Sequence, residues 1–235
     1  MTAQPVPAVV NHVQHDVPRP APIGRRVAVV ALTVGATLNL AEALIGRIVG
    51  QSSSIEGSLE AVAANPTLAR IGLVLGTVAV PFLMLALVAM AHLIRPRMPK
   101  LGTTAMVLGL VGALGFFGIH VVSVYDYAAI DQPDREAMVA LIESAQNSPL
   151  ALLVLVPFLL GMAGSVLLTS IGYLRTRVMA IWIPVVLLAF LVLDFGGFPV
   201  GPVDPHWLFV AASAGLAVTI AQRSDHDWWT GTATP

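Results

Sequence analysis

Residues 71–100 read IGLVLGTVAVPFLMLALVAMAHLI followed directly by RPRMPK. The first part carries no Asp, Glu, Lys or Arg over its whole length. At about 1.5 Å per residue, a helix of this length covers the roughly 30 Å hydrocarbon core of a bilayer. A basic cluster directly after it is typical of the cytoplasmic edge of a membrane. The stretch therefore predicts a membrane-spanning helix that ends in the cytoplasm.

The rest of the chain has the same character. Hydrophobic residues make up 57% of the sequence and charged residues only 11%, against about 25% charged in a typical soluble domain. In lipid, each apolar stretch must be helical to satisfy its own backbone hydrogen bonds. We therefore predict an all-α polytopic membrane protein with six transmembrane helices as three outward-opening hairpins, the last two stretches being shorter. The stretches are residues 27–47, 71–94, 101–125, 150–174, 178–193 and 207–221.

The basic residues between these stretches predict the orientation. They gather in one set of connections, at Arg25, Arg26, Arg95, Arg97, Lys100, Arg175, Arg177 and Arg223. Because basic residues concentrate on the cytoplasmic side, we expect both termini in the cytoplasm. The expected organisation is a disordered cytoplasmic tail at 1–24, a six-helix transmembrane domain at 25–222 and a cytoplasmic C-terminal tail at 223–235. In that tail, Trp228 and Trp229 are expected at the level of the lipid headgroups.

The first two outer connections resemble each other. Each predicts a short amphipathic helix, at 56–64 and 133–146, with Ser53 and Glu56 as a capping box and Pro133 in a first turn. The spans that follow share a motif, Pro-Phe-Leu, at 81–83 and 157–159. These matches indicate an internal repeat with a period near eighty residues. The alternative is that apolar segments with turn prolines look alike by chance.

Three ionisable residues lie at similar depth on different helices. Glu42, His120 and Asp194 are each about 25–28 Å from the expected cytoplasmic edge. An ionisable group at such depth normally faces the protein interior or a water-filled cavity. We predict an outward-facing polar cavity that binds a ligand or proton, formed by Glu42, His120, Asp194, Asn39, Asp126, Asp204 and His206. The alternative places Asp194 at the interface and His120 on a backbone carbonyl.

Few residues favour catalysis or a metal. The chain has no cysteine, and no span carries two histidines at the i, i+4 spacing typical of metal helices. His120 and His206 are the remaining candidates for a metal or haem. We expect no catalytic residue and no cofactor. A net charge of -1 argues against nucleic acid, whereas lipids, a second copy or a membrane partner packing on Gly, Ala and Ser helix faces are expected partners.

Composition and architecture together suggest a source. Lys100 is the single lysine, and with the six apolar stretches the chain resembles uncharacterised six-span integral membrane proteins of actinobacteria. This resemblance rests on no diagnostic motif. It implies the bacterial cytoplasmic membrane as location and no particular activity.

Three functional hypotheses remain at this point. The leading one is a non-enzymatic membrane protein that binds or moves a small solute or proton through the outward-facing cavity. The second is a metal- or haem-dependent membrane enzyme that uses the same residues. The third is an accessory subunit of a membrane complex.

Overall fold

The computed structural model describes residues 20–50, 52, 54–196 and 203–231, and within them the chain is helical without any strand. In this part, four helices are long and apolar enough to cross a membrane. They are α1 (Arg25–Val49), α3 (Pro66–Ile94), α4 (Pro99–Ile130) and α6 (Leu152–Thr176), the last preceded by a 3-10 turn, η1 (Pro149–Ala151). These four coincide with the first four predicted spans.

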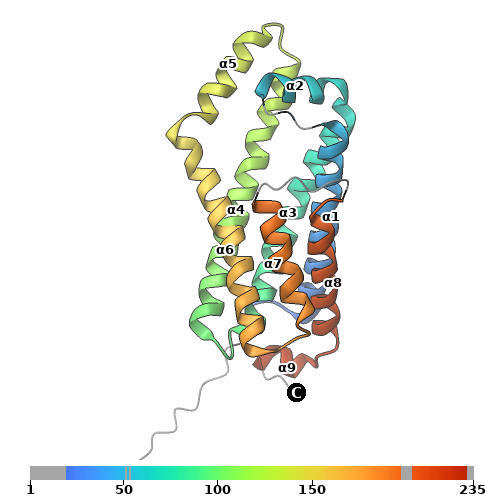
Figure 1. Ribbon diagram of the computed structural model, residues 1–235, viewed down its shortest axis with the longest axis vertical. Helices are drawn as coiled ribbons and strands as arrows, with labels where there is room; N and C mark the ends of the chain where they lie inside the picture. The colour runs from blue at the N-terminus through green and yellow to red at the C-terminus, as the bar shows by residue number, and fades with distance from the viewer. Residues whose placement is uncertain (1–19, 51, 53, 197–202, 232–235) are drawn as a thin grey trace, which may run out of the picture.

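The last two predicted spans are shorter helices. They are α7 (Trp182–Phe195) and α8 (His206–Ala221), with 14 and 16 residues. At 1.5 Å per residue they measure about 21 and 24 Å, less than the roughly 30 Å of a bilayer core. Figure 1 shows both helices stopping partway along the longer ones.

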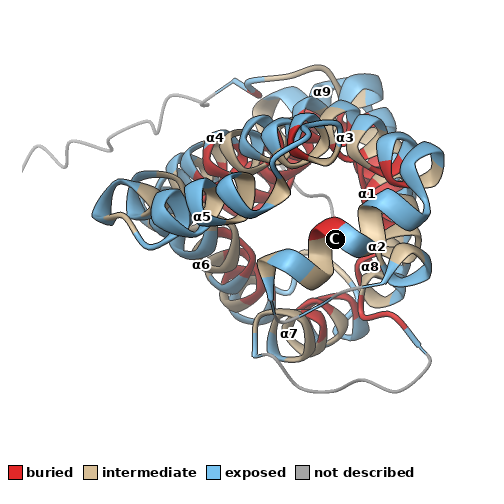
Figure 2. Cartoon of the chain, turned by 90° about the horizontal axis from the view of Figure 1, so that it is seen from above, coloured by how far each residue is buried: buried red, intermediate tan, exposed pale blue. Residues whose placement is uncertain are grey.

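The six helices form a closed ring. Neighbouring helices pack in the order α1, α3, α4, α6, α7, α8, and α8 packs back on α1, while α3 also contacts α6. Figure 2 shows this ring from above. Helices from all parts of the chain therefore surround one common interior.

Two short helices lie in the connections from α1 to α3 and from α4 to α6, where the sequence predicts them, at the opposite end of the bundle from α9 (Asp225–Thr230) (Figure 1). The first, α2 (Ile55–Ala64), is capped by Ser54, whose hydroxyl accepts from the Gly57 amide at 3.1 Å. The expected cap, Ser53, lies outside the described residues.

The second outer helix, α5 (Arg135–Gln146), begins two residues after Pro133. The Asp134 carboxylate accepts from the Ala137 amide at 3.0 Å. A side chain that satisfies a free N–H in this way fixes where a helix begins. The expectation that Pro133 lies in the first turn is therefore wrong.

The predicted basic clusters meet at one end of the bundle. Arg25 bonds Asp225 at 2.7 Å, next to the end of α8. Arg97 donates to the carbonyl of Thr176 at 3.3 Å. The connections that carry the arginines are thus neighbours in space, as the orientation argument requires.

Trp228 is the exception at this end. Its side chain is fully buried, and its indole N–H donates to the Ile23 carbonyl at 2.8 Å. The ring of His92 packs edge-on against it, and its Nε2 donates to the Trp228 carbonyl at 2.9 Å. Because α9 folds back onto the bundle, the expectation that Trp228 lies among lipid headgroups is wrong, whereas Trp229 remains exposed.

Glycines bring the long helices into backbone contact. A Cβ atom on Gly112 of α4 would lie 2.6 Å from the carbonyl carbon of Gly161 on α6 and would also collide with Met162. Gly35 of α1 lies against the backbone of Phe82 and Leu83 on α3 in a similar way. These small residues are therefore used for packing inside the chain.

We predict that Gly112→Ala lowers the free energy of unfolding by about 1–3 kcal/mol, because the new methyl group forces two helix backbones apart. Gly164→Ala is the matched control on the same interface, since its Cβ meets only the flexible end of Leu108, 3.0 Å away. Thermal unfolding of purified protein in detergent measures both. Equal melting temperatures for the two variants would contradict this account of the α4–α6 contact.

Candidate functional site

The predicted site residues line two main cavities. The outer cavity, of about 410 Å³, contains Glu42 and His120. The inner cavity, of about 60 Å³, contains Asn39, Asp194 and His206. Glu42 and His120 thus meet as expected, whereas Asp194 faces a different space.

The remaining two candidates lie beside these cavities. Asp126 lines a third cavity of about 220 Å³, which shares Ser52, Ser58 and Val62 with the outer cavity. Asp204 lies beside the inner cavity and contacts His206.

His120 joins α4 to α1. Its Nε2 lies 2.7 Å from Oε1 of Glu42, and its Nδ1 lies 2.9 Å from the carbonyl of Phe116. A carbonyl only accepts hydrogen bonds, so Nδ1 carries a proton. The contact with Glu42 requires one further proton, on either the imidazole or the carboxyl. The pair therefore holds one shared proton, and Glu42 keeps a quarter of its side chain exposed beside the outer cavity.

Four helices build the outer cavity: α1, α2, α3 and α4. Hydroxyl groups of Ser58, Ser123 and Tyr127 line it, and none of the described lysine or arginine residues does. Tyr127 donates to the Ala69 carbonyl at 2.8 Å and so ties α4 to α3. Gly76 leaves room for the Glu42 carboxylate, which any Cβ atom at that position would displace. Sequence reasoning missed Gly76 because depth alone does not reveal which glycine faces a carboxylate.

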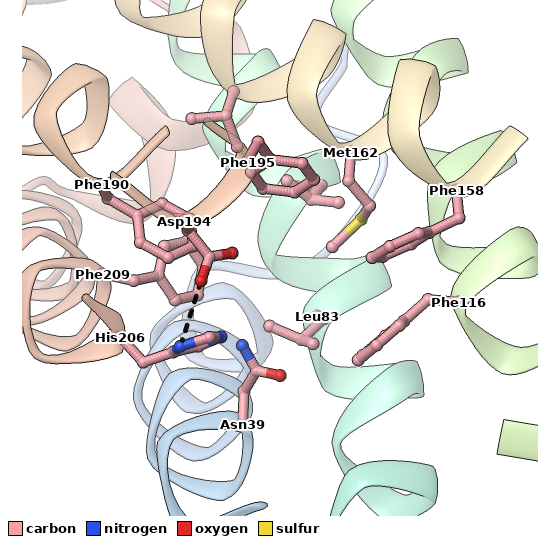
Figure 3. A pocket seen from close by; sticks show the side chains of 12 residues that line it. Asn39, Leu83, Phe116, Phe158, Met162, Phe190, Asp194, Phe195, His206 and Phe209 are labelled. Carbon is pink, nitrogen blue, oxygen red and sulfur yellow. Dashed lines mark ion pairs between the residues drawn. The ribbon is translucent and has the colours of Figure 1, made fainter. Parts of the chain in front are cut away.

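The inner cavity receives side chains from all six helices of the ring (Figure 3). Its wall is largely aromatic. The rings are those of Phe116, Phe158, Phe190, Phe195 and Phe209. Phe116 also lines the outer cavity, so this one residue forms a wall common to both spaces.

Asp204 holds His206 in position. Oδ1 of Asp204 accepts from the His206 backbone amide at 2.9 Å and from Nδ1 of its ring at 2.8 Å, while Oδ2 pairs with Arg47. Burial opposes ionisation, but the hydrogen bonds from His206 and the charges of His206 and Arg47 outweigh it and lower the pKa of Asp204. Sequence reasoning missed Arg47, whose signal was a basic residue at the outer end of the first span.

The described residues do not form the ligand set that a metal or haem site would need. No group of three or more His, Asp or Glu side chains there is arranged to hold a metal ion. Both ring nitrogens of His120 already face hydrogen-bonding partners, and His206 lies in the other cavity.

We predict that Asp204→Asn lowers the free energy of unfolding by about 1–3 kcal/mol at pH 7, because Arg47 and His206 lose a buried acceptor. Because the pKa of Asp204 is lower in the folded state, its ionised carboxylate stabilises the fold at every pH above the unfolded-state pKa, near 3.9. This stabilisation is lost as the pH falls through the folded-state pKa. The difference from wild type should persist down to about pH 5 and close only below about pH 4.

Asp131→Asn is the matched control, since Asp131 is exposed and its contact with Arg70 measures 3.6 Å. Its melting temperature should stay close to that of wild type. Equal effects of the two substitutions at pH 7 would refute the role given to Asp204.

Comparison with known proteins places the chain in a family. A family model described as a family of unknown function (DUF6796) matches residues 53–194, which include His120 and Asp194 and leave Glu42 and His206 outside. No curated protein and no solved structure matches the chain. Because the matched region exceeds half of the sequence, the chain belongs to the DUF6796 family of unknown function.

Proposed function

We propose that this protein is a six-span integral protein of the bacterial cytoplasmic membrane that binds or moves a small solute or proton. The outer cavity is the entry site, and the Glu42–His120 pair is the proton-binding group. The observation that carries the proposal is the 2.7 Å contact of this pair beside a cavity of about 410 Å³.

The dimensions and chemistry of the outer cavity support this function. Small-molecule sites commonly measure about 300–1,000 Å³. An ionisable pair inside a membrane bundle is costly and is usually retained for function. The carboxylate and the hydroxyl groups favour a proton or a cation over an anion. A cation that reached Glu42 would compete with the shared proton, which would couple solute binding to proton release.

The orientation follows from the basic end of the bundle. Arginines concentrate where α1 begins and where α3, α6 and α8 end, which favours the cytoplasm for this end and for both termini. The opposite end, with α2 and α5, would then face outward, and the outer cavity would open toward that side.

The proposed orientation predicts which single introduced cysteines can be labelled from outside the cell. The chain has no cysteine of its own, so no native residue has to be replaced first. Gln132→Cys, next to α5, should react with a membrane-impermeant maleimide in intact cells. Lys100→Cys, in the first turn of α4, should react only after the membrane is permeabilised. The reverse pattern would overturn the proposed orientation.

Proton movement predicts a second result, measured in vesicles that contain the reconstituted protein and a pH-sensitive dye. Under an imposed membrane potential, wild-type vesicles should change internal pH faster than protein-free vesicles. Glu42→Gln should slow this change at least tenfold, because an amide cannot share the His120 proton as a carboxylate does.

Ser58→Ala is the control, since Ser58 lines the same cavity and, among the described residues, its hydroxyl donates to carbonyls of its own segment, those of Ser52 and Ser54. Its rate should stay within about twofold of wild type. Wild-type vesicles that behave like protein-free vesicles would overturn proton movement, as would a folded Glu42→Gln protein with the wild-type rate.

A further inference from the structure

The inner cavity carries polar groups that the proposed function does not use. We propose that it binds a small primary ammonium ion, R–NH₃⁺, through Asp194, His206 and Asn39. This site is separate from the Glu42–His120 pair and does not depend on it. Four steps lead to the chemistry of the ligand.

The first step is an amide without a partner. Asn39 is only 8% exposed, and within the described residues its side chain has no hydrogen bond. Figure 3 shows it pointing toward His206 at the edge of the cavity. Because Asn39 lines the cavity, a ligand bound there can pair with its amide group.

The second step is the balance of charge. Arg47 pairs with Asp204, so its charge is already matched. The ion pair of Asp194 found among the described residues is a 3.6 Å contact with the His206 ring. Asp194 also lies in the last turn of α7, where the partial charge of the helix end is negative. A carboxylate at this place favours a cation.

The third step is the count of acceptors. Nδ1 of His206 donates to Asp204, so a neutral ring presents its Nε2 as an acceptor. The Asp194 carboxylate supplies a second acceptor. Asn39 turns its amide nitrogen toward His206 in Figure 3, and a half-turn of the amide group presents its carbonyl oxygen as the third. Figure 3 shows His206 lying between the other two side chains. A primary ammonium group has three N–H donors, which matches this set.

The fourth step is the aromatic wall. The five phenylalanines that line the cavity attract a cation through their ring faces and pack around an alkyl group. A cavity of about 60 Å³ limits that group to a few non-hydrogen atoms, since one water molecule occupies roughly 30 Å³ in the liquid. Methylammonium and ethylammonium therefore fit this site better than larger amines.

The test is binding of methylammonium chloride to the purified full-length protein, measured by calorimetry at constant ionic strength. Saturable binding is expected, with at least tenfold weaker binding of tetramethylammonium, which lacks N–H donors. Asp194→Asn should weaken methylammonium binding at least tenfold. Asp131→Asn, which removes an exposed carboxylate outside the inner cavity, should leave methylammonium binding unchanged.

Val166→Leu provides a second variant that keeps every charge. Val166 lines the cavity and is buried, so a larger side chain there should fill the space and abolish binding. Equal affinity for sodium, unsaturable binding, or a folded Asp194→Asn or Val166→Leu protein with wild-type affinity would each overturn the proposal.

Discussion

Close backbone contact between paired helices is the constraint on which the rest of this bundle depends. In the membrane that we propose as its location, lipid tails are as apolar as the helices, so association of the helices would rest on packing rather than on the hydrophobic effect. In the first pair, Gly35 of α1 meets Phe82 of α3, and in the second, Gly115 of α4 meets Phe158 of α6. Each phenylalanine directly follows a proline inside its helix. The two halves thus use the same contact, which favours the internal repeat over chance similarity.

The third pair differs, and the difference creates the inner cavity. Helices α7 and α8 stop short of the others, and their ends bring Asp194 and His206 into the ring. Membrane proteins tolerate polar groups at such depth where they line a cavity. Phe116 connects this region to the outer one, since its carbonyl holds His120 while its ring lines the inner cavity. This one residue therefore forms part of both cavity walls.

The sequence was most informative about the lengths of the helices and about how far along its helix each residue lies. Apolar stretches bounded by arginines predicted the four long helices closely, because few other structures accommodate such composition. The same reasoning paired Glu42 with His120 by depth. It also grouped Asp194 with them, because depth says nothing about rotation around a helix axis. Trp228 was misplaced for a related reason, since tryptophan is favoured both at headgroups and in buried contacts with a free carbonyl, here that of Ile23.

The closure of the ring has a consequence for biosynthesis. Arg25 bonds Asp225, 200 residues later in the chain, so α1 lacks its last neighbours until these further residues have been made. At about 5–20 residues per second, this delay is roughly 10–40 s. During that time the side of α1 that α8 will cover, with Asn39 near it, lacks the helix that packs on it in the folded protein. Ribosome pausing late in the message would therefore lengthen the period in which the nascent chain is open to quality-control proteases.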